Sequence, residues 1–162
     1  MDYLLSLTKN ILYAAVTAGA GLLAALFVFQ TRLVYPSNLP QGSTAKVDTP
    51  DTLGLQFDAA AIATKDGLLL QAFLVKPSRA SKVTVVYFQS NAGNIGHRLP
   101  LAQVFSRDLG CYVLMVSYRG YGLSPGSPNE AGLKIDALVT SAKHRQHSAT
   151  LRHTPFSAKQ RS

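Results

Sequence analysis

The chain has 162 residues and a mass of 17.4 kDa, enough for one modest domain and too few for two. It is 47% hydrophobic and 15% charged, which excludes a disordered or collagen-like chain and indicates a membrane segment, because soluble domains carry roughly 25% charged residues. The formal net charge is +8, and residues 141–162 hold five of the 16 Lys and Arg but none of the eight Asp and Glu.

An uncharged apolar run occupies residues 11–29 and is interrupted only by Thr17, Gly19 and Gly21. About 19 residues at 1.5 Å each give roughly 28 Å, close to the hydrocarbon thickness of a bilayer. We therefore predict an amino-terminal segment, 1–32, with a single transmembrane helix over about 11–29. A buried core helix is the alternative. Lys9 and Arg32 flank the run almost equally, so the charges leave its orientation open.

Residues 33–55 are rich in Pro, Ser, Thr, Gly and Asp, and this composition predicts a juxtamembrane linker. A domain over 56–140 follows. Its first two strands, 57–64 and 68–75, are joined by an Asp-Gly turn and predict a hairpin. The runs 83–88 and 112–116 are short and apolar, as in strands buried on both faces.

A helical pattern lies between these two buried strands. Leu101, Val104, Phe105 and Leu109 recur at helical spacing and Gly110 ends the run, with Asn94 expected as the cap and Pro100 in or near the first turn. A strand, a helix and a second strand in this order predict a parallel pair.

A second helix is expected after the fourth strand. Ser127-Pro128-Asn129-Glu130 has the spacing of a capping box, with Ser127 as the cap and Pro128 in the first helical position. We expect this helix to end near Ser141. The remainder, 141–162, shows no sustained period and predicts a basic disordered tail.

Ligands of open α/β sheets bind at the carboxyl ends of parallel strands, and two loops leave such ends here. The first, 89–94, reads Q-S-N-A-G-N, and its small residues let backbone N–H groups approach an anion or a developing oxyanion. An ordinary strand-to-helix turn is the alternative. Neither the phosphate-loop nor the dinucleotide fingerprint is present.

The run V-T-V-V-Y-F, then N-A-G-N-I-G-H-R-L-P, then Y-V-L-M-V-S-Y-R-G-Y-G-L-S-P-G-S-P-N-E resembles the bud-emergence (Bem-type) group of membrane-anchored α/β hydrolases. The resemblance covers roughly 30–140. It implies an α/β fold, here a partial α/β-hydrolase fold comprising the first four strands and two helices. It also implies an oxyanion loop after the third strand, a Ser-Asp-His triad, and ester, thioester or lipid-like acyl substrates at the endoplasmic reticulum or another endomembrane.

Two departures from the family pattern bear on activity. The family has His-Gly before N-A-G-N, and this chain has Gln89 and Ser90, so the oxyanion loop would be a remnant made of Gln89, Ser90, Asn91 and Ala92. The strand that carries the nucleophile elbow in the family would follow residue 140, where the basic tail begins. We therefore expect a chain truncated before its nucleophile and inactive as it stands.

The second loop, 118–126, contains the Y-R-G-Y-G block, which comprises Tyr118, Arg119, Gly120, Tyr121 and Gly122. We expect Tyr118 and Arg119 to brace the loop at the sheet edge, with substrate contact as the alternative.

The same loop also contains a formal G-x-S-x-G centred on Ser124, with Asp136 and His144 in triad order. The interpretation as a triad is disfavoured, because Pro125 has no N–H to offer an oxyanion and Ser124 lies about six residues past its strand.

The other candidate residues have structural interpretations. His97 is expected on a helix surface, and Cys111 as a small core residue that excludes an internal disulfide and a Cys-based zinc site. The tail histidines His144, His147 and His153 lack a rigid scaffold, so no metal and no cofactor are expected.

Two non-enzymatic functions remain as alternatives. An apolar strand at 83–88 that lacks its family neighbour would pair with a full-length relative or another chain. The basic tail would bind anionic lipid or nucleic acid, although five charges over 22 residues are a sparse density for either. An acyl substrate is expected only if a complete domain exists.

Overall fold

The structure is a computed structural model that describes residues 2–150, with side chains described for 3–144. It consists of two compact units, residues 1–34 and residues 35–162. The first unit is a single helix, α1 (Asp2–Val34). Its stretch Tyr3–Val34 is long and apolar enough to cross a membrane. The helix is longer than the predicted 11–29, because no proline interrupts it and apolar residues continue before residue 11.

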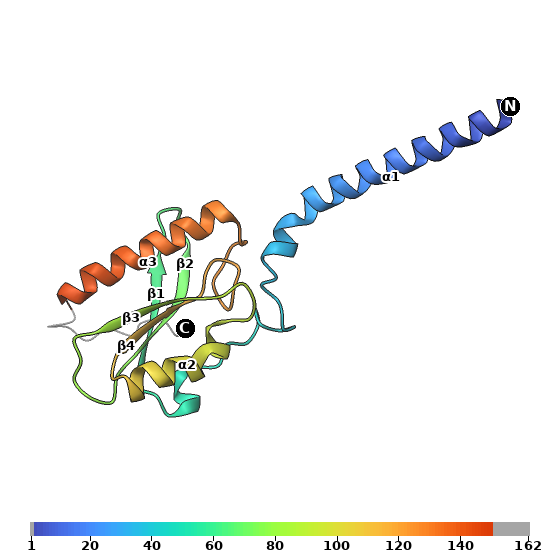
Figure 1. The fold of residues 1–162 in the computed structure, drawn as a ribbon. Helices are drawn as coiled ribbons and strands as arrows, with labels where there is room; N and C mark the ends of the chain where they lie inside the picture. Colours follow the sequence, from blue (N-terminus) through green and yellow to red (C-terminus); the bar gives the residue numbers. More distant parts are fainter. Residues whose placement is uncertain (1, 151–162) are drawn as a thin grey trace. The chain divides into compact units, whose positions relative to one another are not determined.

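The second unit is built on a four-stranded sheet of order β1-β2-β4-β3 (Figure 1). Strands β1 (Phe57–Ala63) and β2 (Leu69–Val75) form the predicted antiparallel hairpin, with Ala60 opposite Ala72. Strand β4 (Tyr112–Val116) is antiparallel to β2. Strand β3 (Thr84–Phe88) pairs with β4 in parallel, as predicted, and lies at the sheet edge.

Both faces of the sheet carry apolar side chains, because successive residues of a strand point to opposite faces. Phe73, Val75, Val113 and Met115 face one side and pack with Leu99 and its neighbours. Ala72, Leu74, Leu114 and Val116 face the other side and pack with Val139. The sheet is thus sandwiched between helices, as in an α/β fold (Figure 1).

The helices follow the predicted order with two corrections. Residues 95–108 form one helical segment that begins after Asn94 and includes α2 (Leu99–Gln103), and Pro100 lies in the first turn of α2. Helix α3 (Glu130–Thr150) covers the other face of the sheet. It does not end near Ser141, because neither Gly nor Pro occurs between 133 and 154 to stop it. Residues 151–162, the rest of the expected tail, lie outside the described residues.

The cap of α3 also differs from the prediction. Asn129 Oδ1 accepts a hydrogen bond from Gly132 N at 2.8 Å, so Asn129 is the cap rather than Ser127. Pro128 stays in the preceding loop because it packs on Gly120, where an added Cβ would lie 2.5 Å from its Cδ. The two residues that were expected to begin the helix therefore belong to the loop.

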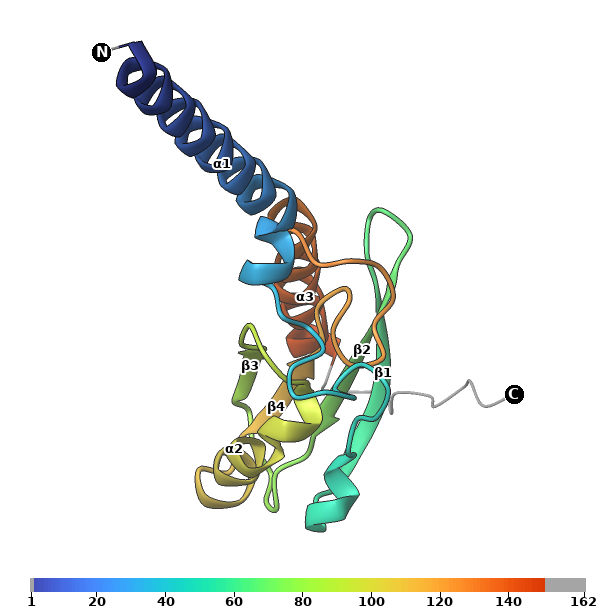
Figure 2. The same cartoon turned by 90° about the vertical axis from the view of Figure 1, so that its right-hand side faces the viewer.

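Residues 35–55, predicted as a linker, belong to the second compact unit. They run beside the start of the α2 segment (Figure 2). They also contain a 3-10 turn, Pro50–Leu53, and bury Ser43, Pro50 and Leu55 against the domain. Composition alone did not reveal these contacts, which join positions about 50 residues apart.

Candidate functional site

The two expected loops meet at the carboxyl ends of β3 and β4. Phe88, the last residue of β3, stacks on Tyr118, which lies just after β4, with ring centroids 6.2 Å apart. The buried Tyr121 hydroxyl donates a hydrogen bond to the Asn91 carbonyl at 2.8 Å. The Y-R-G-Y-G block and the loop over 89–94 are therefore one connected structure.

Three successive carbonyl groups of the first loop are held by side-chain donors. The Asn91 carbonyl accepts from Tyr121, the Ala92 carbonyl from Arg98 Nη2 at 3.2 Å, and the Gly93 carbonyl from Gln89 Nε2 at 2.9 Å. In a trans peptide the N–H points away from the preceding carbonyl. Holding the Asn91 carbonyl on Tyr121 therefore turns the Ala92 N–H to the opposite side.

Glycine is required at the centre of this loop. Gly93 has φ of +78°, and a Cβ there would lie 2.8 Å from His97 Nδ1. Next to it, Asn94 caps the following turn by accepting from His97 N at 3.3 Å, and His97 Nδ1 accepts from Asn94 N at 3.3 Å. His97 is exposed, as expected, and its ring serves this capping box.

Gln89 stands where the resemblance implies a histidine. Its side chain is 6% exposed and its Nε2 fixes the loop, while its Oε1 is buried and has no hydrogen-bond partner among the described residues. Ser90 is exposed and accepts from Arg98 Nη2 at 2.8 Å. The residues that replace the family's His-Gly thus take part in holding the loop.

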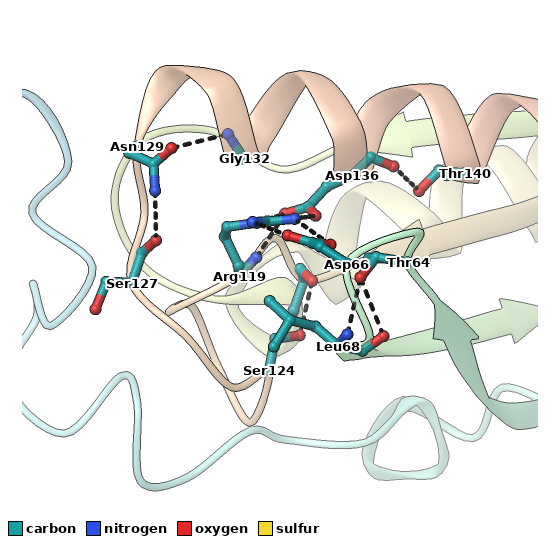
Figure 3. Close-up of polar contacts among 11 residues, drawn as sticks. Thr64, Asp66, Leu68, Arg119, Ser124, Ser127, Asn129, Gly132, Asp136 and Thr140 are labelled. Atoms are coloured by element: carbon teal, nitrogen blue, oxygen red, sulfur yellow. Dashed lines mark hydrogen bonds and ion pairs between the residues drawn. The ribbon is translucent and has the colours of Figure 1, made fainter.

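Arg119 is the centre of a charge cluster, the Arg119 cluster, with the buried Asp136 and the exposed Asp66 (Figure 3). Its Nη2 lies 2.7 Å from Asp136 Oδ1 and its Nη1 lies 2.7 Å from Asp66 Oδ2. Its backbone N–H also donates to Asp136 Oδ2 at 2.9 Å. Asp66 belongs to the β1–β2 turn and Asp136 to α3, so Arg119 joins three parts of the domain.

Hydrogen bonds and burial shift the pKa values of four side chains in this region. Hydrogen bonds from Arg119 and then Thr64 lower the pKa of Asp66 to about 2. Hydrogen bonds to Asp136 and Asp66 raise the pKa of Arg119, so the guanidinium stays charged. Burial raises the pKa of Tyr121 to about 12, which keeps its hydroxyl protonated as a donor to Asn91. Burial, followed by the Asp136 charge, raises the pKa of Tyr118.

Ser124 and Asp136 are committed to structural bonds. Ser124 is buried, its hydroxyl donates to the Ser117 carbonyl at 2.7 Å, and it accepts from Gln71 N at 2.9 Å. The Asp136 carboxylate is held by Arg119 (Figure 3). His144 lies on α3 rather than in an irregular tail. Ser124 thus braces the turn and Asp136 is the ion-pair partner of Arg119.

Among the described residues, no group of three His, Cys, Asp or Glu side chains is arranged to hold a metal ion. Cys111 is a free, half-buried thiol. Sequence reasoning missed the partners of Arg119 and the hydrogen bonds from Asn94 Nδ2 to the Ser43 and Lys46 carbonyls. One local signal for the partner Asp136 was available. It is the only acid among residues 131–144, and it shares a helix face with Val139 and Thr140, which indicates a buried carboxylate in need of a basic partner.

Comparisons with known proteins agree with this geometry. The chain is 47% identical to Protein bem46 of Schizosaccharomyces pombe over 124 residues, which are 75% of this chain and 42% of that protein. It is 40% identical to the uncharacterized membrane protein YNL320W of Saccharomyces cerevisiae over 134 residues, 79% of this chain and 46% of that protein. The chain thus spans less than half the length of these curated relatives.

Among solved structures, an esterase of Pyrococcus furiosus, Pf2001, has a similar fold. The TM-score is 0.54 at 18% identity, over 63% of this chain and 39% of the esterase. No family model matches the chain.

Proposed function

The chain belongs to the Bem46-type α/β-hydrolase family, and we propose that it supplies the oxyanion side of a membrane-associated serine hydrolase site. The proposal assigns the loop of Gln89, Ser90, Asn91 and Ala92 to this role. The substrates would be esters, thioesters or lipid-like acyl compounds. No cofactor is needed for such chemistry, because a serine nucleophile and backbone donors carry it.

The observation that carries the proposal is the anchoring of three successive carbonyl groups in the loop after β3. The Asn91 carbonyl, held by Tyr121, points away from the Ala92 N–H of the same peptide. The Ala92 and Gly93 carbonyls are held by Arg98 and Gln89. A fixed N–H stabilises the negative charge that develops on the oxygen of an attacked ester, and losing one such donor costs about 10²–10³ in rate.

The described residues supply the support of a site rather than its nucleophile. Ser124 is the serine with a nucleophile-like sequence context, and both functions of its hydroxyl are used within the fold. Pro125 follows it and has no N–H for an oxyanion. We therefore propose that the 162 residues alone form no acyl-enzyme.

Helix α1 supports a membrane location for this site. We propose that it is a single-pass anchor in the endoplasmic reticulum or another endomembrane, since its apolar stretch exceeds the roughly 20 residues that a bilayer requires. Alkaline carbonate extraction of membranes tests the anchor. The chain should stay in the membrane pellet, and its release to the supernatant would contradict an integral anchor.

Labelling with a fluorophosphonate tests the assignment of the nucleophile. The purified full chain in detergent should not react, and Ser124→Ala should give the same result. A chimera in which residues 35–140 replace the aligned part of the S. pombe relative should react at a serine outside 35–140. Stoichiometric labelling of the chain itself, at any serine, would overturn the proposal.

The oxyanion role is tested in the same chimera. Ala92→Pro removes the proposed N–H donor and should lower the labelling rate about 10²-fold. Ala80→Pro, in the exposed loop before β3, is the matched control and should keep the rate. Equal rates for the two variants would show that the Ala92 N–H has no such role.

A second candidate function rests on β3. This strand is at the sheet edge and uncharged over Thr84–Phe88, with Phe88 and the preceding Val83 exposed. Such an edge favours pairing with a strand of a full-length relative. Co-purification of the two differently tagged chains, lost on Val86→Pro, would support this function. A monodisperse chain that fails to bind the relative would contradict it.

The third alternative, binding of anionic lipid or nucleic acid by the basic tail, falls mostly on residues outside the described part. It stays a prediction. Binding that survives deletion of 141–162 would contradict it.

A further inference from the structure

The segment that directly follows α1, residues 35–48, is folded into turns. We call it the juxtamembrane strap. Asn38 Oδ1 accepts from Gly42 N at 3.0 Å and from Thr44 Oγ1 at 3.2 Å. Lys46 N donates to the Gly42 carbonyl at 3.1 Å, and Ser43 is almost fully buried. The strap is thus an ordered part of the domain, although its composition is that of a linker.

The strap is bonded directly to the proposed oxyanion loop. Gly93 N donates to the Leu39 carbonyl at 2.6 Å. Asn94 Nδ2 donates to the Ser43 carbonyl at 2.7 Å and to the Lys46 carbonyl at 2.8 Å. Farther along, Gly96 approaches the strap so closely that a Cβ there would lie 2.6 Å from Asp48 N.

Asn94 uses its whole side-chain amide in this arrangement. Both N–H groups go to strap carbonyls, and its Oδ1 accepts from His97 N at 3.3 Å. The residue is fully buried, so a lost donor would remove the bonds to the buried Ser43 carbonyl and the partly buried Lys46 carbonyl. Aspartate, which keeps the accepting oxygen but has no N–H, cannot replace these two bonds.

The strap also fixes the orientation of one peptide group in the loop. In the Ala92–Gly93 peptide, the carbonyl accepts from Arg98 Nη2 at 3.2 Å and the N–H donates to Leu39 of the strap. With the strap in place this planar group is held on both sides, and without it only one restraint remains. The Ala92 N–H belongs to the preceding peptide, which Tyr121 holds, so the strap restrains this N–H from the other side of Ala92 through the Gly93 N–H bond.

We propose that Asn94 is a positioning residue, which couples the juxtamembrane strap to the oxyanion loop so that the segment leaving the membrane anchor sets the loop's shape. The importance of this coupling for catalysis rests on the proposed function. The coupling itself is a property of the fold and is measurable without any hydrolysis.

Amide hydrogen exchange of the full chain in nanodiscs tests the coupling. Asn94→Asp should raise exchange at least tenfold in residues 35–48 and also in residues 89–93, and should leave β4 and α3 unchanged. Asn129→Asp is the matched control, because it too keeps a capping oxygen but lies away from the strap. It should leave both segments protected. Fast exchange confined to the strap would overturn the coupling, as would equal effects of the two variants.

Gly96→Ala provides a second variant should Asn94→Asp fail to fold. Its methyl group would lie 2.6 Å from Asp48 N and 3.0 Å from Asn94 Oδ1, so it would displace the strap while both N–H donors of Asn94 are kept. It should expose the same two segments to exchange. Protection of 89–93 that persists while the strap exchanges freely would overturn the proposal.

Labelling kinetics of the chimera distinguish positioning from general stability. Asn94→Asp should lower the maximal fluorophosphonate labelling rate at least tenfold and leave the half-saturating probe concentration unchanged. Asn129→Asp should change neither. If the labelling rate of the chimera does not depend on Ala92, the proposed function is contradicted. The coupling would still hold if Asn94→Asp raises hydrogen exchange in both segments.

Discussion

Gly132 and Arg119 are in direct contact, and the absence of a side chain at Gly132 makes the contact feasible. A Cβ at Gly132 would lie 2.5 Å from Arg119 Cδ and 2.6 Å from its Nε. The arginine crosses the first turn of α3 at this point on its way to Asp136 and Asp66 (Figure 3). Glycine normally destabilises a helix, but here it leaves the space that Arg119 needs to reach the buried Asp136.

Replacing Gly132 by Ala should therefore destabilise the domain, against the usual trend for helices. Alanine favours a helix by up to about 1 kcal/mol over glycine, but here it displaces Arg119 from a carboxylate that is fully buried. Breaking such a pair costs about 3–5 kcal/mol, so we expect a net loss of about 2–4 kcal/mol.

Pulse proteolysis of the full chain in detergent, over a urea series, measures this loss. The neighbouring exposed Ala131→Gly, which removes a methyl group from the same turn, should cost about 1 kcal/mol or less. A Gly132→Ala variant as stable as the wild type would show that Arg119 has another path across the helix.

The pH dependence of stability should depend on Asp66. Its pKa in the folded domain is lowered from 3.8 to about 2, first by the hydrogen bond from Arg119. A lowered folded pKa contributes stability above the unfolded value, and this contribution is lost as the pH falls from about 4 towards 2. Asp66→Asn should therefore flatten the decline of the free energy of unfolding in this window.

Chemical denaturation at pH 5, 4, 3 and 2 measures that slope. Lys65→Ala alters the same turn without removing a carboxyl group and should keep the wild-type slope. If Asp66→Asn and the wild type lose stability in parallel, the ion pair with Arg119 does not form in solution.

The sequence was most informative about the sheet. The four strands begin and end within one residue of their predicted bounds. Strand positions depend on local apolar runs, which any single sequence displays. Of the two runs with the pattern of buried strands, only β4 is buried; β3 is half-buried, with Phe88 exposed, because it lies at the sheet edge. Asn94 as a cap and the parallel pair of β3 and β4 followed from equally local patterns.

Errors arose where distant contacts override local patterns. Ser127-Pro128 fits the start of a helix, yet Pro128 packs on Gly120 and the helix begins after Asn129. Residues 35–48 have the composition of a linker, yet Asn94 binds two of their carbonyls. The partners of Arg119 lie 17 and 53 residues away. No local pattern encodes such pairings.

The cap of α3 gives a direct test of one correction. Asn129→Ala should lower the free energy of unfolding by about 1 kcal/mol, because the Gly132 N–H loses its acceptor. Ser127→Ala changes an exposed loop residue and should stay within about 0.5 kcal/mol of the wild type. Urea titration of both variants decides between the two caps, and a larger loss for Ser127→Ala would restore Ser127 as the cap.

Replacing Ser124 distinguishes a structural role of its hydroxyl from a catalytic one. Its hydroxyl joins the Ser117 carbonyl to the Gln71 N–H, so Ser124→Ala leaves two buried backbone groups without their partner. We expect a loss of about 1–3 kcal/mol in unfolding free energy, measured by pulse proteolysis in urea, with Ser127→Ala as the exposed control. A catalytic serine shows the opposite behaviour, since its replacement abolishes labelling and leaves stability nearly unchanged. Retained stability in Ser124→Ala would therefore contradict the bracing role, because the turn would then hold without this hydroxyl.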